Sequence, residues 1–166
     1  MKAYWVLSVA ILLGCQKSEV ISDFTGNEAS YGLVQASQYA ISGTVTFKER
    51  KDGTTTILVK LAGTSGAALL PVHMHLGDLS VDGAPVAFLL KPVNSQTGTS
   101  ETIITQLADE TKVTYKSLLK LSAYINVHLA STGAESNIIL AAGNIGTNGT
   151  KSSANGRIQI GVCSSK

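Results

Sequence analysis

The chain has few of the residues that usually carry cross-links, charge and chemistry. Its 166 residues include two cysteines, three histidines and one tryptophan, and only 14% are charged. Aromatic residues make up 5%, whereas 44% of the residues are hydrophobic. A chain this apolar is not disordered, and one this poor in charge is atypical of a cytosolic helical protein. The length suggests a single domain.

The low charge and the missing motifs also limit the function. The formal net charge is +2 and the basic residues are scattered, so the clustered basic face of a nucleic-acid-binding protein is missing. The chain has no Gly-x-Ser-x-Gly nucleophile motif, no Gly-rich phosphate loop and no Cys-x-x-Cys pair. We therefore expect a non-catalytic protein without a nucleic-acid partner.

No apolar run near the N-terminus is long enough to cross a membrane. Residues 6–13 are apolar apart from Ser8, whereas a spanning helix needs ~20 residues. The run ends in Leu12-Leu13-Gly14-Cys15, which resembles the lipobox of bacterial lipoproteins, where a peptidase cuts after the Gly and the Cys carries lipid. The alternative is an ordinary secretory signal with a chance cysteine. The resemblance implies a signal peptide over 1–14, a lipidated Cys15 and a lipid anchor in a membrane of the bacterial cell envelope.

The residues after Cys15 show no regular period and predict a flexible tether over 15–38. Gln16 directly after the cysteine, in place of Asp, fits sorting to the outer membrane. Lipidation of Cys15 leaves Cys163 unpaired, which excludes a disulfide framework in the mature monomer. We expect Cys163 to be an inert thiol near the end of the last strand, and a reactive exposed thiol is the alternative.

The rest of the chain has the pattern of short strands joined by turns. Residues 40–48 and 54–61 alternate apolar and polar side chains around a charged Asp-Gly turn, which predicts a hairpin. A change of period over 109–121, after Asp109, Glu110 and Thr111, predicts one or two helical turns. Further strands are expected around residues 72–76, 86–90, 101–107, 124–128, 137–142 and 156–163. About eight strands and one short helical insert indicate an all-β, antiparallel, Ig-like Greek-key β-sandwich over 39–163.

The alternation also predicts which side chains form the core. These are the inward-facing apolar residues of the expected strands: Val45, Phe47, Ile57, Val59, Leu61, Ile125, Val127, Ile138, Leu140, Ile158 and Ile160.

All three histidines lie on the polar faces of apolar strands. His73 and His75 alternate with Val72, Met74 and Leu76, so both imidazoles point one way, about 6.6 Å apart at ~3.3 Å per residue. In the second strand Tyr124, Asn126 and His128 share one face. If the two strands lie in one sandwich, the three rings converge on a common pocket.

Such a cluster has two interpretations. Neutral imidazoles are common ligands of zinc and copper, so His73, His75 and His128 form a candidate site for one Cu or Zn ion. Asp78 and Asp82 could complete it, although loop aspartates are mostly turn formers. Alternatively, the histidines form a hydrogen-bonded polar cluster with Tyr124 and Asn126.

Several of these segments together resemble a known family. His73-Met74-His75-Leu76-Gly77, the apolar strand 86–90 and Tyr124-Ile125-Asn126-Val127-His128 resemble the CHRD domain, which was named for its repeats in chordin and occurs singly in bacterial proteins. The family pattern is His-Ile-His-Gly, then Tyr-Val-Asn-Val-His, then Gly-Glu-Ile-Arg-Gly. The third motif is altered here, because Gly143-Asn144-Ile145-Gly146 lacks the Glu and the Arg. The resemblance covers residues 39–162.

The resemblance implies a sandwich similar to that of copper/zinc superoxide dismutase and a module that binds a partner. We therefore expect a cell-envelope lipoprotein that binds an unknown protein or glycan without catalysis. A two-metal dismutase centre needs more histidines than the three present. The alternative function is a single-metal domain that uses His73, His75 and His128 for redox or hydrolytic chemistry.

Overall fold

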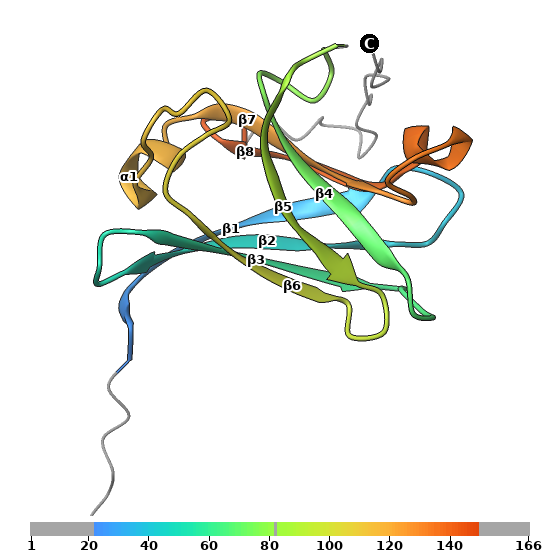
Figure 1. Ribbon diagram of the computed structural model, residues 1–166, viewed down its shortest axis with the longest axis horizontal. Coiled ribbons are helices and arrows are strands. Elements are labelled where there is room, and N and C mark those ends of the chain that lie inside the picture. Colours follow the sequence, from blue (N-terminus) through green and yellow to red (C-terminus); the bar gives the residue numbers. More distant parts are fainter. Residues whose placement is uncertain (1–21, 82, 150–166) are drawn as a thin grey trace, which may run out of the picture.

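Eight antiparallel strands form one closed barrel in the computed structural model, which describes residues 22–81 and 83–149 (Figure 1). The strands are β1 (Phe24–Gln35), β2 (Ser42–Arg50), β3 (Thr55–Ala62), β4 (Leu69–Leu76), β5 (Val86–Asn94), β6 (Thr99–Ile104), β7 (Ser122–His128) and β8 (Ile139–Gly146). Around the barrel their order is β1-β2-β3-β6-β5-β4-β7-β8. Two short helical elements, α1 (Tyr115–Leu118) and the 3-10 turn η1 (Ala134–Asn137), lie in the connections.

The predicted two-sheet sandwich is wrong, although the all-β class is correct. A sandwich keeps two separate sheets, whereas here one sheet closes on itself when β8 pairs back to β1, at Val34 with Ala142 and Gln35 with Ala141. Alternation along a strand decides which side chains face inward, and it does so equally well in a sandwich and in a barrel. The sequence pattern therefore could not separate the two architectures.

The strand that closes the barrel, β1, lies inside the segment predicted to be a tether, so that prediction is wrong over Phe24–Gln35. Ala29, Tyr31 and Leu33 alternate toward the core, and the Tyr31 ring meets the Phe47 ring edge-on with 5.7 Å between centroids. Most other β1 side chains are polar and exposed, which hid this short alternation. The predicted signal peptide, Cys15 and the rest of the tether up to residue 21 lie outside the described residues.

The core follows the predicted alternation closely. Seven of the predicted residues are buried in one cluster: Val45, Phe47, Ile57, Val59, Ile125, Val127 and Leu140. Leu61 and Ile138 are partly buried and pack against that cluster. The last predicted strand, with Ile158, Ile160 and Cys163, lies outside the described residues. Side chains fill the barrel interior, as is usual for eight strands.

A short helical segment covers one end of the barrel. The helix predicted over 109–121 is only α1, and Thr114 caps it rather than Asp109, Glu110 or Thr111. Thr114 Oγ1 accepts from the Ser117 N–H at 3.3 Å, and Ser117 Oγ accepts from the Thr114 N–H at 2.8 Å. Leu118 is fully buried in the core cluster, so α1 closes the end at which β6 stops and β7 begins.

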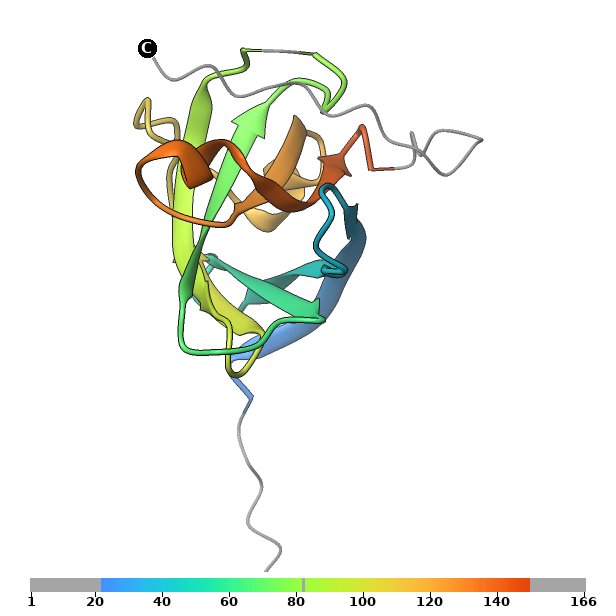
Figure 2. The same cartoon turned by 90° about the vertical axis from the view of Figure 1, so that its right-hand side faces the viewer.

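The other end of the barrel is bordered by four connections, one of which includes η1. The odd-numbered strands β1, β3, β5 and β7 all run toward this end. It therefore carries the β1–β2, β3–β4, β5–β6 and β7–β8 connections. Figure 2 looks onto this end. Over the described residues, no helix has the length and apolar character needed to cross a membrane.

Candidate metal centre

The two histidine-bearing strands are direct neighbours. β4 pairs with β7 in antiparallel register, which places His73 opposite Asn126 and His75 opposite Tyr124. His128 then lies diagonally across from His73, two residues beyond Asn126. Diagonal and directly opposite side chains on one face of a sheet are close enough to interact. The predicted convergence of the three rings therefore follows from the β4–β7 ladder alone.

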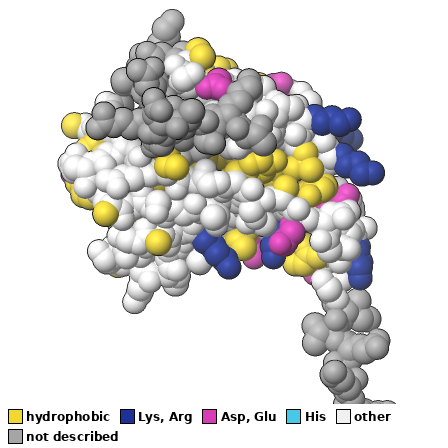
Figure 3. Space-filling view, turned by 180° about the vertical axis from the view of Figure 1, so that it is seen from behind, with side chains coloured by type: hydrophobic (Ala, Val, Ile, Leu, Met, Phe, Trp, Pro, Cys, Tyr) yellow, Lys and Arg dark blue, Asp and Glu magenta, His cyan; other side chains and the backbone are white. Residues whose placement is uncertain are grey.

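The histidines point outward from the barrel but are not exposed as a group. Their strand neighbours Met74 and Val127 point inward and are fully buried, so the histidine face is the outer one. Even so, His75 is only 2% exposed and His128 only 3%, whereas His73 is half-buried. Figure 3 shows the molecule from behind the view of Figure 1; on that face a band of hydrophobic side chains lies beside basic ones and no histidine is visible.

The connection after β4 folds back over the outer face and covers His75. Gly77 starts it with a φ of +101°, a conformation that favours glycine. Asn144 Oδ1 then accepts from the Leu79 N–H at 2.9 Å, and the Asn148 Nδ2 group donates to the Gly77 carbonyl at 2.8 Å. Leu79 is 1% exposed and packs on Tyr124, beside the histidines. The polar face of the two strands thus forms a second, smaller buried layer.

Two backbone carbonyls decide which ring nitrogens carry protons. The His75 Nδ1–H donates to the Ala84 carbonyl at 3.0 Å, and the His128 Nδ1–H donates to the Ser136 carbonyl at 2.8 Å. A carbonyl oxygen can only accept, so each neutral ring carries its proton on Nδ1 and presents a lone pair on Nε2. Both Nε2 atoms are buried and have no hydrogen-bond partner among the described residues.

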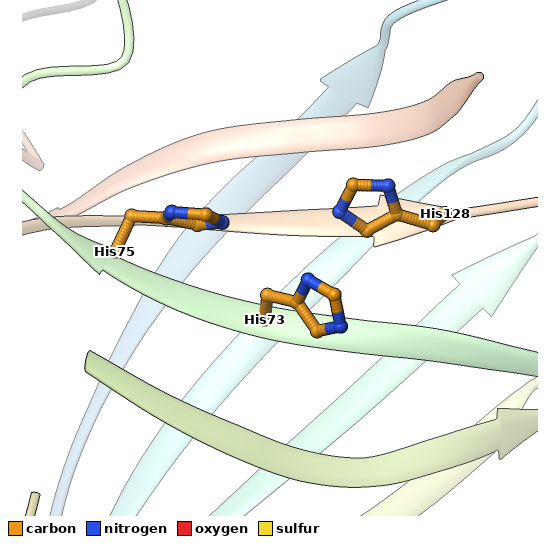
Figure 4. Close-up of side chains that lie close together, drawn as sticks. All are labelled: His73, His75 and His128. Carbon is orange, nitrogen blue, oxygen red and sulfur yellow. The ribbon is translucent and has the colours of Figure 1, made fainter. Parts of the chain in front are cut away.

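The three rings face one another across a short space (Figure 4). The ring centroids of His73 and His128 are 4.5 Å apart, and those of His73 and His75 are 6.0 Å apart. One nitrogen from each ring can be chosen so that the three atoms lie within 4.8 Å of one another. The His75 ring also stacks on Tyr124, with centroids 4.9 Å apart and planes 5° from parallel.

All three imidazoles are held in the neutral form. Burial, the largest cause, and the neighbouring His128 and His75 together lower the pKa of His73 from its ordinary value to about 4. Burial also lowers the pKa of His75 and of His128, against the opposing effect of their bonds to the Ala84 and Ser136 carbonyls. Neutral rings at pH 7 are the form that binds metals.

Some of the other predicted site residues lie beside the histidine cluster, and others do not. Tyr124 and Asn126 are 4% and 0% exposed and lie beside the cluster, as expected. Asp78 forms a turn, because its Oδ1 accepts from the Ser80 N–H at 3.0 Å and from the Ser80 hydroxyl at 2.8 Å. No carboxylate joins the histidine cluster in the described part of the chain. Asp82 lies outside the described residues.

Sequence reasoning missed the groups that orient the rings. The Ala84 and Ser136 carbonyls are backbone groups, so no residue type in the sequence indicates their role. The amides of Asn144 and Asn148 fix the covering connection, but the sequence pattern predicts only a strand end at Asn144 and a polar loop at Asn148. The only available signal was the altered family motif Gly143-Asn144-Ile145-Gly146, where Asn144 sits in place of the missing Glu.

The arrangement suits one cation that prefers nitrogen ligands. Zinc and copper bind imidazole nitrogen, and a tetrahedral ion at ~2.0–2.1 Å from each ligand needs these atoms about 3.3 Å apart. The atoms lie within 4.8 Å here, so the rings need to close by up to roughly 1.5 Å. His73 is the ring most able to move, since it is the least buried of the three.

Comparison of the chain with protein-family models, with curated proteins and with solved structures finds no match. The resemblance to the CHRD domain therefore stays a prediction from the three sequence motifs.

Proposed function

We propose that this protein binds a single copper or zinc ion through His73, His75 and His128. The observation that carries the proposal is the pair of buried Nε2 lone pairs on His75 and His128, each oriented by a backbone carbonyl on the far side of its ring. Metal-binding histidines characteristically donate their second N–H to a carbonyl or carboxylate, which fixes the ring and raises its basicity.

The polar-cluster interpretation accounts for these atoms less well. With both protons on Nδ1, the two Nε2 atoms are acceptors and cannot hydrogen-bond to each other. Leaving a buried acceptor without a partner costs about 1–3 kcal/mol. One cation would satisfy both lone pairs together with a His73 nitrogen. Among the described residues, the cluster holds no carboxylate that could act as a general base, so the proposal is binding rather than catalysis.

Thermal melting of the apoprotein with and without added Zn²⁺ or Cu²⁺ tests the proposal. At a free metal concentration of 100 times Kd, binding to the folded state adds about 2.7 kcal/mol, which raises the Tm of a domain of this size by about 5–10 °C. We expect that rise in the wild type at pH 7.5 and its loss in His75→Ala and in His128→Ala.

Leu89→Ala is the matched control, because Leu89 lies opposite His73 in the β4–β5 ladder but is 64% exposed and offers no ligand atom. It should keep the full metal-induced rise in Tm. An equal response of wild type and His75→Ala would reject the site. Elemental analysis of the loaded protein should give one ion per chain.

We also propose that the barrel is carried on a lipid-anchored envelope protein. Support comes from Leu12-Leu13-Gly14-Cys15 after the apolar run. Mass spectrometry of the membrane fraction should show an acylated Cys15 at the mature N-terminus, and Cys15→Ser should abolish it. A mature chain cut at another position would contradict this proposal. Binding of a protein or glycan partner by a CHRD-like domain remains the alternative function if no metal binds.

A further inference from the structure

The histidine cluster offers fewer ligands than the ions it suits require. Zinc in proteins is nearly always four-coordinate, and Cu²⁺ prefers a square-planar or tetragonal arrangement, which also needs at least four ligands. The cluster supplies three nitrogens, and no Cys, Asp or Glu of the described chain joins them. An ion bound there therefore has a coordination position that the three histidines do not fill.

This fourth position points away from the barrel. His73, His75 and His128 all project from the outer face of the paired strands β4 and β7, so an ion bound by them lies above that face. In a tetrahedron, the fourth ligand lies on the opposite side of the ion from the other three. The position therefore faces outward, away from the buried core residues Met74 and Val127.

The surroundings leave the position open on the side of β5. The connections that carry Ala84 and η1 fold against His75 and His128 and bond to their Nδ1 atoms. On the other side, Leu89 lies directly opposite His73 in the β4–β5 ladder and is 64% exposed. A small ligand can therefore reach the ion between His73 and Leu89.

The site has no negative charge that would balance the ion. A metal-bound imidazole is neutral, so a divalent ion held by three of them keeps its full positive charge. Across the described strands β4, β5, β7 and β8, the one side chain that is charged at pH 7 is Lys91, which is also positive. A partly buried charge without a counter-charge is unfavourable, so a negative ligand is favoured over a neutral one.

We propose, building on the metal site proposed above, that the bound ion takes a small monovalent anion from solution as its fourth ligand, at the opening between His73 and Leu89. The anion donates a lone pair to the ion and displaces a water molecule from that position, and no electron is transferred. The flanking side chains Leu89 and Val86 are apolar and offer no polar contact. The anion is therefore recognised by its charge and its donor atom.

The full chain loaded with Co²⁺ tests the proposal, because Co²⁺ can replace zinc at nitrogen ligands and its visible absorption bands change with its coordination. Azide and acetonitrile are matched probes: both are linear, have three heavy atoms and bind through nitrogen, but only azide is charged. Azide should change the bands saturably and bind at least about tenfold more tightly than acetonitrile, because the ion attracts only the anion by its charge. Equal affinities, or unchanged bands with azide, would overturn the proposal.

The same measurement separates the outside ligand from the metal site itself. If Co²⁺ does not bind, or binds equally well to His75→Ala, both proposals fail. If Co²⁺ binds to the wild type and not to His75→Ala, but azide leaves the bands unchanged, the metal site stands and only the anionic ligand is wrong.

Two substitutions of exposed apolar residues locate the opening. Leu89→Asp places a negative charge opposite His73, whereas Ile103→Asp places the same charge at a 50% exposed position of β6, a strand that pairs with neither β4 nor β7. Leu89→Asp should weaken azide binding at least about fivefold, the ratio for two unit charges ~4 Å apart even at the dielectric constant of water. Ile103→Asp should bind azide as the wild type does. Equal azide affinity in the two variants would overturn the proposed position of the anion.

Discussion

At the scale of single residues, the three histidines differ in what holds their rings. His75 is fixed on two sides, by the Ala84 carbonyl and by the parallel face of Tyr124. His128 is fixed by the Ser136 carbonyl. His73 is half-buried and contacts the other two rings. Two rigid ligands and one more mobile ligand would allow the ion to enter from the His73 side and the third bond to close last.

The lowered histidine pKa values predict a pH-dependent stability of the apoprotein. The pKa of His73 is about 4 in the folded chain and ~6.5 when unfolded, so below pH 6.5 the unfolded state binds more protons. The stabilisation is complete above pH 6.5 and is lost as pH falls toward 4. The Tm without metal should therefore decrease between pH 7 and pH 4.5, measured by circular dichroism.

His73→Gln serves as the comparison for this pH dependence. Glutamine is neutral over the whole pH range, so the variant lacks the proton that unfolded His73 takes up. Its Tm should fall less steeply over the same range. The carboxylates Asp52 and Asp109, whose pKa values are lowered by hydrogen bonds from Thr54 and Thr111, also affect stability at acid pH but are identical in both proteins. Parallel profiles for the two proteins would mean that His73 does not carry the effect.

At the scale of strands, two facing positions at the β1–β8 seam differ in how much space they leave. A Cβ on Gly143 in β8 would overlap the Gly32 carbonyl oxygen, whereas a Cβ on Gly32 in β1 would meet no atom within 4 Å. The backbones approach closely there because β8 has no side chain at that point. Glycine in a strand often marks such an approach.

This difference makes a matched pair of substitutions. Gly143→Ala should destabilise the protein by about 1–3 kcal/mol, because β8 or β1 must move to relieve the overlap. Gly32→Ala should change the stability by no more than about 0.5 kcal/mol, as expected for an open surface position. Urea unfolding of both variants gives the two values. Equal effects would show that the seam between β1 and β8 is not as tight as described.

At the scale of the whole molecule, closure of the barrel depends on β1. This strand pairs with β2 over much of its length and with β8 at its end. Without β1, the edges of β2 and β8 would be free to pair with other chains. Edge strands of this kind promote aggregation, so β1 protects both of its neighbours.

Truncation tests this role. A chain that begins at Ser22 keeps all described strands and should unfold cooperatively as a monomer. A chain that begins at Ala36 lacks β1 and should lose cooperative melting or aggregate in size-exclusion chromatography. If residues 15–38 were only a tether, the two chains would have the same Tm, and the closed barrel would be wrong.

The sequence by itself determined the local features of this protein. Alternation alone assigns Val45, Phe47, Ile57 and Val59 to the core, and the same period of two places His73 and His75 together on one strand face. Such patterns are local, because each depends only on where successive side chains point. They hold in the closed barrel as well as in the sandwich that the sequence predicts.

The tertiary structure decided everything that depends on distant pairing. Closure required β1 to meet β8 across more than a hundred residues, and no periodicity within either strand encodes that choice. The β4–β7 ladder brought His128 to His73. The β4–β5 and β7–β8 connections supplied the Ala84 and Ser136 carbonyls. Those groups are backbone atoms present in every residue, so only their position in the folded chain gives the two Nε2 atoms their role.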